Sequence, residues 1–196
     1  KLGVDYAFTG SQKCLSAPPG LAPFALSQRG RECLGQVRGW YSDLSRVAVY
    51  WEQEGYFCTS PVLLHYALEE ALKLALEEGL ENRQKRAELL YSTVLSLLEE
   101  LGFSAYAAEG ARLPTVLVVR PPQGLHEAEI RKGLYARGVS VAGGIGPTAG
   151  KVLRLGLMGE SARPEHYRVF FKALGEVLGK SGLERAFEER LGLVAL

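Results

Sequence analysis

Lys13 is the residue of this sequence whose type and surroundings are best suited to covalent chemistry. It stands in residues 9–20, among small, neutral and polar neighbours, and this segment contains no carboxylate that could pair with the amine. A lysine that is desolvated in such a place becomes nucleophilic toward an aldehyde. Most lysines are solvated surface charges, however, and the residues alone favour that simpler interpretation.

Arg154 is the second residue whose type and position suggest a role in chemistry, because it interrupts an alternating apolar segment at residues 152–157. Strand alternation places Val152, Arg154 and Gly156 on one face. A buried guanidinium needs an anion, and bidentate pairing with a carboxylate is the usual solution. The carboxylate could belong to a ligand or to a glutamate of the protein itself.

Tyr56 and Thr59 place two hydroxyl groups just before Ser60 and Pro61, a pair typical of a helix start. Hydroxyl donors beside a helix N-terminus suit an anion. The alternative is purely structural, with Thr59 or Ser60 as a helix cap and Tyr56 packed in the core.

The composition excludes several classes of protein. The chain has 196 residues, 47% of them hydrophobic, and a net charge of +1, so a polyanionic partner such as nucleic acid is not expected. No apolar run reaches the roughly 18 residues of a membrane span, and no signal-peptide pattern opens the chain. We therefore expect a cytoplasmic protein without a membrane partner. The three cysteines and three histidines lack metal-ligand spacing, so no metal site is predicted.

The apolar periodicity predicts two different regions. Strands are expected at residues 4–9 and 21–26, an irregular aromatic loop at 30–55, and long amphipathic helices at 61–79 and 81–101. Beyond these we expect a small α+β layer with strands at 115–119, 139–141 and 152–157 and helices at 126–137 and 164–178. Acidic pairs such as Glu77-Glu78 are interpreted as solvated helix ends. Met158 is the only methionine and the chain opens at a strand-like edge, so we expect an upstream portion to be missing.

Five segments, taken in order, resemble the class V aminotransferases, the group of the alanine–glyoxylate and serine–pyruvate aminotransferases. The first is residues 9–21, Thr-Gly-Ser-Gln-Lys-Cys-Leu-Ser-Ala-Pro-Pro-Gly-Leu, which is similar to that family's cofactor-lysine segment. The others are Tyr-Phe-Cys-Thr-Ser-Pro at 56–61, Glu-Gly-Leu-Glu-Asn at 78–82, Leu-Pro-Thr-Val at 113–116, and the glycine-rich stretch 143–159. Each match alone is weak, but their order along nearly the whole chain is specific.

The resemblance implies an α/β fold of the pyridoxal-phosphate-dependent transferase type I and assigns a role to each residue above. Lys13 would form the Schiff base with pyridoxal 5′-phosphate, and Gln12 would hydrogen-bond the cofactor phosphate. Tyr56 and Thr59 would reach the phosphate of the other subunit, which implies a homodimer with shared active sites. Arg154 would bind the substrate α-carboxylate. The implied reaction moves an amino group from a small amino acid such as alanine or serine to glyoxylate or pyruvate.

The same resemblance implies two domains. Residues 1–79 would be the end of the large cofactor domain, and residues 80–196 the C-terminal α+β domain. Two alternatives stay open. A cysteine desulfurase-like lyase of the same fold would normally carry histidine before the cofactor lysine and a later catalytic cysteine, whereas Gln12 precedes Lys13 and no cysteine follows Cys58. The other alternative is a non-catalytic, truncated structural fragment.

Overall fold

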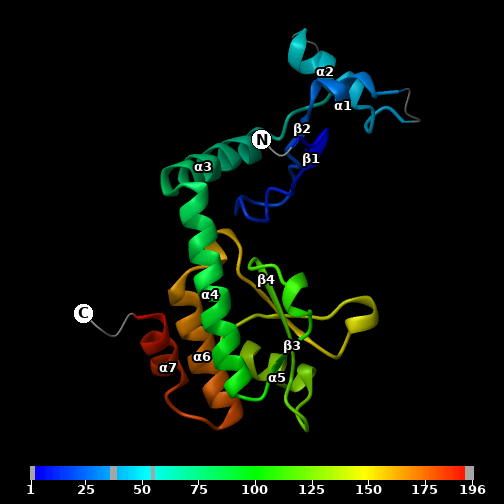
Figure 1. Cartoon of the computed structure of the whole chain (residues 1–196). Helices are drawn as coiled ribbons and strands as arrows, with labels where there is room; N and C mark the ends of the chain where they lie inside the picture. Colours follow the sequence, from blue (N-terminus) through cyan, green and yellow to red (C-terminus); the bar gives the residue numbers. More distant parts are fainter. Residues whose placement is uncertain (1–2, 36–38, 54–55, 193–196) are drawn as a thin grey trace. The chain divides into compact units, whose positions relative to one another are not determined.

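The computed structural model, drawn in Figure 1, describes residues 3–35, 39–53 and 56–192. The chain divides into two compact units between residues 74 and 75. The first unit is Lys1–Leu74 and the second is Ala75–Leu196. The division falls within helix α3 (Val62–Glu78). Each unit is described below by itself, and the assignment of functional domains to residues 1–79 and 80–196 stays a prediction.

A two-stranded antiparallel sheet opens the first unit. Strands β1 (Tyr6–Phe8) and β2 (Phe24–Leu26) pair with Tyr6 opposite Leu26 and Phe8 opposite Phe24. The sequence predicted both strands at these places, with longer bounds. Their connection is the segment that carries Lys13.

Two short helices lie in the region that was predicted to be a loop, so that prediction is wrong. Helix α1 (Gln28–Glu32) is capped by Ser27, and helix α2 (Leu44–Glu52) by Asp43, whose side chain accepts a hydrogen bond of 3.0 Å from the Ser45 backbone N–H. Five residues are too few to display a helical period. Such short helices depend on their caps, because helix nucleation is costly.

The second unit is a four-stranded antiparallel sheet with helices, as expected for an α+β layer. Its strands, in spatial order, are β3 (Ser104–Ala105), β4 (Val116–Arg120), β6 (Leu153–Gly156) and β5 (Ala142–Gly143). The helices are α4 (Leu80–Glu100), α5 (Glu127–Tyr135), α6 (Pro164–Leu178) and α7 (Leu183–Leu191). The long helices α3 and α4 and the helix α6 confirm the sequence prediction, whereas α7 was not predicted.

The edge strand β5 differs from the prediction. The sequence placed a strand at residues 139–141, but pairing with β6 begins only at Ala142, which lies opposite Arg154. Gly143 lies opposite Leu153. Hydrogen bonding to β6 decides which residues belong to this strand. The apolar pattern of residues 139–141 therefore predicted the strand in the wrong place.

The core of the second unit lies between the sheet and its helices. The rings of Phe171 on α6 and Phe187 on α7 stack with centroids 5.2 Å apart, and both side chains are fully buried. Figure 1 shows α7 beside α4, and α6 packs against α7. The other large, fully buried side chains are Leu90, Leu98, Leu117, Ile130, Leu134, Leu153, Leu157, Leu174, Val94 and Val119.

Beyond the end of β5, the edge of strand β6 is capped by a side chain. The Tyr167 hydroxyl donates a hydrogen bond of 2.9 Å to the Gly156 carbonyl oxygen. Burial raises the pKa of the Tyr167 phenol, which therefore stays protonated and remains a donor. Tyr167 is 5% exposed and belongs to the core.

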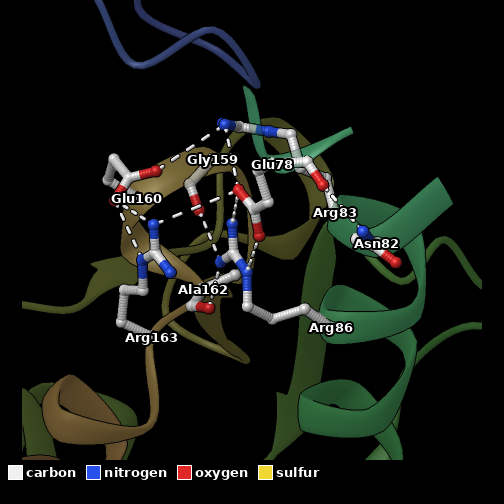
Figure 2. A network of polar contacts seen from close by, with 8 residues as sticks. All are labelled: Glu78, Asn82, Arg83, Arg86, Gly159, Glu160, Ala162 and Arg163. Carbon is white, nitrogen blue, oxygen red and sulfur yellow. Dashed lines mark hydrogen bonds and ion pairs between the residues drawn. The ribbon is translucent and has the colours of Figure 1, made fainter. Parts of the chain in front are cut away.

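An ion-pair network joins the last turn of α3 to the first turns of α4 (Figure 2). Glu78 accepts hydrogen bonds from Arg86 at 2.6 Å (Nε) and 2.8 Å (Nη2), and Arg83 lies 3.2 Å away. Arg86 also donates to the carbonyl oxygens of Gly159 and Ala162, which follow β6. The Glu78 side chain is only 20% exposed, so its interpretation as a solvated helix end is wrong. Its partners near residue 160 lie too far along the sequence for local charge patterning to reveal them.

Candidate functional site

The loop that carries Lys13 is closed by a buried serine. The Ser11 side chain is fully buried, and its hydroxyl donates a hydrogen bond of 2.6 Å to the Pro18 carbonyl oxygen. The Ser11 backbone N–H donates to the Leu21 carbonyl oxygen, and its own carbonyl accepts from Ala17, both at 3.0 Å. Ser11 therefore ties the outward and the returning arms of the loop together.

Lys13 and Gln12 lie at the outer turn of this loop, and both are exposed. The backbone N–H of Lys13 donates to the Gly10 carbonyl oxygen at 3.0 Å, which forms the turn. The Gln12 amide folds back over Gly10, where an added Cβ would lie 2.7 Å from Gln12 Oε1. The predicted position of Lys13 in a loop between two strands is confirmed, but its reach to a cofactor carbon stays a prediction.

Tyr56 and Thr59 bring their hydroxyl groups together immediately before helix α3. The two hydroxyl oxygens lie 2.6 Å apart, and both residues are exposed. Phe57 stacks on Trp40, with ring centroids 6.0 Å apart, and thereby holds this segment to the residues before α2. The helix begins at Val62, one residue later than expected, and the Ser60 hydroxyl lies 3.5 Å from the Tyr50 hydroxyl.

Arg154 lines a cavity of about 580 Å³ in the second unit. Its Nε donates a hydrogen bond of 2.6 Å to the Gly143 carbonyl oxygen on the neighbouring strand. Among the described residues, no carboxylate lies within 4.0 Å of its guanidinium, although the side chain is half-buried. The cavity also contains the cationic or hydrogen-bonding side chains of Arg131, Ser140, Ser161 and His166. A half-buried arginine without a protein carboxylate, at the wall of a cavity, suits an anionic ligand.

The chain is similar in sequence to several aminotransferases. No protein-family model matches the chain. An uncharacterized aminotransferase of Methanocaldococcus jannaschii is 38% identical over 199 residues, covering 96% of this chain and 52% of the relative. The alanine–glyoxylate aminotransferase of Callithrix jacchus is 36% identical over 186 residues, covering 90% of this chain and 45% of the relative.

The chain is homologous to the class V aminotransferases. A crystal structure of an alanine–glyoxylate aminotransferase from Nostoc sp. superimposes with a TM-score of 0.84 at 37% identity, covering 90% of this chain and 48% of that one. The fold is therefore that of the type I pyridoxal-phosphate-dependent aminotransferases, as the sequence predicted. The chain spans about half the length of the curated relatives it matches.

The candidate site residues of this chain form two groups. Lys13, Gln12, Tyr56 and Thr59 belong to the first unit, and Arg154 belongs to the second. That Lys13 and Arg154 share one cleft stays a prediction. Within the described ranges, no cluster of His, Cys, Asp and Glu is arranged to hold a metal ion. No helix in the same ranges is long and apolar enough to cross a bilayer.

Sequence reasoning missed two features of these groups. The first is Ser11, whose burial depends on the return of the chain at Pro18 and carries no local signal beyond the polar residue type. The second is the ion pair of Glu127 and Arg131, whose Nη1–Oε1 distance is 3.0 Å and which packs against Gly143 on strand β5, the neighbour of the Arg154 strand. Their spacing of four residues on a helix was the signal that could have revealed this pair.

Proposed function

We propose that the protein to which this chain belongs is a pyridoxal-phosphate-dependent aminotransferase that acts on small amino acids. The donor would be alanine or serine, and the acceptor glyoxylate or pyruvate. The observation that carries the proposal is Arg154, a half-buried cation at a cavity with no carboxylate partner among the described residues. The homology to alanine–glyoxylate aminotransferases supports the choice of substrates.

The residues of the first unit fit a cofactor that bears an aldehyde and a phosphate. Lys13 has an exposed amine, and no carboxylate within 4.0 Å neutralises it among the residues described. Tyr56 and Thr59 offer two adjacent hydroxyl groups before the N-terminus of the 17-residue helix α3, where an anion is favoured. Gln12 adds an amide beside the lysine. We assign the aldehyde to Lys13 and the phosphate to Gln12, Tyr56 and Thr59.

Each side chain then has a separate task in amino transfer. When bound, pyridoxal phosphate supplies an electron sink for the bonds at the substrate Cα. The Lys13 amine would remove the proton from that Cα and return it, because a general base must lie within hydrogen-bonding reach of the proton it moves. Arg154 would bind the substrate carboxylate in a bidentate manner and so fix which Cα bond faces the base.

We further propose that the functional unit is a homodimer in which Tyr56 and Thr59 serve the cofactor of the partner subunit. The support is the exposure of both hydroxyl groups on this chain. An isologous two-fold dimer would build two equivalent sites in this way. The proposal also places the protein in the cytoplasm.

The test uses the full-length protein mixed with pyridoxal phosphate. We expect a visible absorbance band that borohydride abolishes, and transamination of glyoxylate or pyruvate by alanine or serine. The Lys13→Ala variant should lack both, while Lys132→Ala, which removes an exposed lysine on α5, should keep both. A Lys13→Ala variant that keeps the band and the activity would overturn the assignment.

A further inference from the structure

A buried carboxylate opens helix α5 and is paired on its own helix. Glu127 is 4% exposed, whereas its partner Arg131, one turn later, is 44% exposed. The Arg131 Nη1 lies 3.0 Å from Glu127 Oε1. A carboxylate in the first turn of a helix is favoured by the helix dipole, but its burial still requires the arginine.

This ion pair holds the edge strand β5 at two points. Arg131 Nε donates a hydrogen bond of 3.1 Å to the Val141 carbonyl oxygen, just before the strand. Two residues later the pair packs directly against Gly143, where an added Cβ would lie 2.4 Å from Glu127 Oε1 and 2.9 Å from Arg131 Nη1. Because β5 has only two paired residues, its position depends on such side-chain contacts.

Gly143 links the position of strand β5 to the Arg154 side chain. Its carbonyl oxygen accepts the 2.6 Å hydrogen bond from Arg154 Nε, and this is the bond that sets the direction of the guanidinium. Arg131 and Arg154 also line the same cavity. The contacts therefore run without a gap from Glu127 through Arg131 and Gly143 to Arg154.

We propose that Glu127 and Arg131 are positioning residues that aim the Arg154 guanidinium at the substrate carboxylate. They act through strand β5, which sets the direction of the Arg154 guanidinium. The proposal rests on the function assigned above to Arg154. Its consequence is that selectivity for a carboxylate is set partly by an ion pair on α5, because bidentate recognition tolerates little angular error.

The first test is Glu127→Gln in the full-length protein, which keeps the shape of the side chain and removes its charge. The KM for the amino acid should rise on the order of three- to thirtyfold with little change in kcat, the pattern of weakened carboxylate binding. The inhibition constant of propionate, an unreactive carboxylate, should rise by the same factor, while that of propionamide should not change. The matched control is Glu176→Gln, which removes the carboxylate charge from the 2.8 Å ion pair of Arg137 and Glu176, away from β5.

A double-mutant cycle separates positioning from general stability. In an Arg154→Lys background, adding Glu127→Gln should change the KM no further, because the hydrogen bond from Arg154 Nε to Gly143 is already lost. A merely structural role of Glu127 would give additive effects and would overturn the inference. Arg154→Lys alone tests the proposed function: if it leaves the KM unchanged, the carboxylate assignment itself fails. If Arg154→Lys raises the KM but Glu127→Gln leaves it unchanged, only the positioning role of Glu127 fails.

A second variant, Gly143→Ala, disturbs the ion pair of Glu127 and Arg131 without changing any charge. In Gly143→Ala the new methyl group would displace the Glu127 carboxylate from Arg131, since the two atoms it meets are side-chain ends. We expect the same increase of the propionate inhibition constant as in Glu127→Gln. If Glu127→Gln fails to fold, Gly143→Ala decides the outcome, and a propionate constant equal to that of the unmodified protein would contradict the proposal.

Discussion

Arg86 binds Glu78 through two of its guanidinium nitrogens and, with the third, the carbonyl oxygens of Gly159 and Ala162. One side chain on α4 thus satisfies a carboxylate from the end of α3 and two backbone acceptors that follow β6. Removing it would leave the Glu78 carboxylate, 20% exposed, without its principal partner.

We expect Arg86→Met to lower the free energy of unfolding by about 1–3 kcal/mol, because several acceptors lose their donor at once. Chemical denaturation of the full-length protein would measure the change. Arg185→Met is the control, because Arg185 pairs with Glu189 at the surface, where its side chain is 76% exposed. An exposed pair contributes little, so this variant should unfold like the unmodified protein. Equal losses in both variants would contradict the role given to Arg86.

The same network predicts a pH dependence. The hydrogen bond from Arg86 is the main cause that holds the pKa of the Glu78 carboxyl below its ordinary value in the folded protein. A lowered folded-state pKa stabilises the fold at neutral pH, and this stabilisation is lost as the pH falls from the ordinary pKa of a glutamate through the lowered pKa of the folded state. The unfolding free energy of the Glu78→Gln variant should therefore lie below that of the unmodified protein at pH 7 and approach it as the pH is lowered. A difference that is independent of pH would refute the assignment.

Ser11→Ala should loosen the loop that carries Lys13. The substitution leaves the Pro18 carbonyl oxygen without its 2.6 Å partner in a part-buried place, at a cost of about 1–3 kcal/mol. We expect faster dissociation of pyridoxal phosphate from the full-length protein, measured by loss of the visible absorbance on dilution. Ser92→Ala, which removes an exposed hydroxyl bonded to the Leu89 carbonyl, is the control and should dissociate at the normal rate.

Arg154→Ala should weaken transition-state binding of amino acids by about 2–5 kcal/mol, the range for removing one partner of a buried charge pair. The measurement is kcat/KM with alanine, compared with His166→Ala as a second change at the wall of the same cavity. The histidine variant should lose much less, because no role in carboxylate binding is assigned to it. Unchanged kcat/KM in Arg154→Ala would remove the basis of the proposed function.

The shared-site prediction is tested by mixing two inactive variants of the full-length protein. One carries Lys13→Ala and the other carries Tyr56→Phe together with Thr59→Ala. If the phosphate donors come from the partner, each mixed dimer contains one unmodified site, and activity should rise above the sum of the parents. Subunit exchange must be demonstrated independently by differently tagged chains. Activity that never exceeds the parents' sum after exchange would place all of these groups in one subunit.

The fold was predictable where local patterns decide it. Helices α3 and α4 carry long apolar periods, and α4 is followed by Gly102 with a φ of 89°, which L residues rarely adopt. Helix α2 has nine residues, and its Asp43 cap was the usable signal. The position of β5 was not predictable from its own residues. The strand begins at Ala142 because this residue pairs with Arg154 on β6.

The candidate site was predictable in part for the same reason. The loop position of Lys13 and the strand position of Arg154 follow from local sequence, and the structure agrees with both. The burial of Ser11 depends on the return of the chain at Pro18. The contact between Gly143 and the ion pair of α5 depends on the packing of a helix against a strand edge, which one-dimensional patterns do not encode.

The hydrogen bond from Tyr167 to Gly156 has a consequence for the edge of the sheet. A strand edge with open backbone groups is a template on which another chain can add, and this is how ordered aggregates grow. The Tyr167 phenol occupies the acceptor of β6 just where β5 has stopped covering it. Because burial raises the pKa of that phenol and so favours its protonated form, Tyr167 remains a donor, and this acceptor is not open to an added strand.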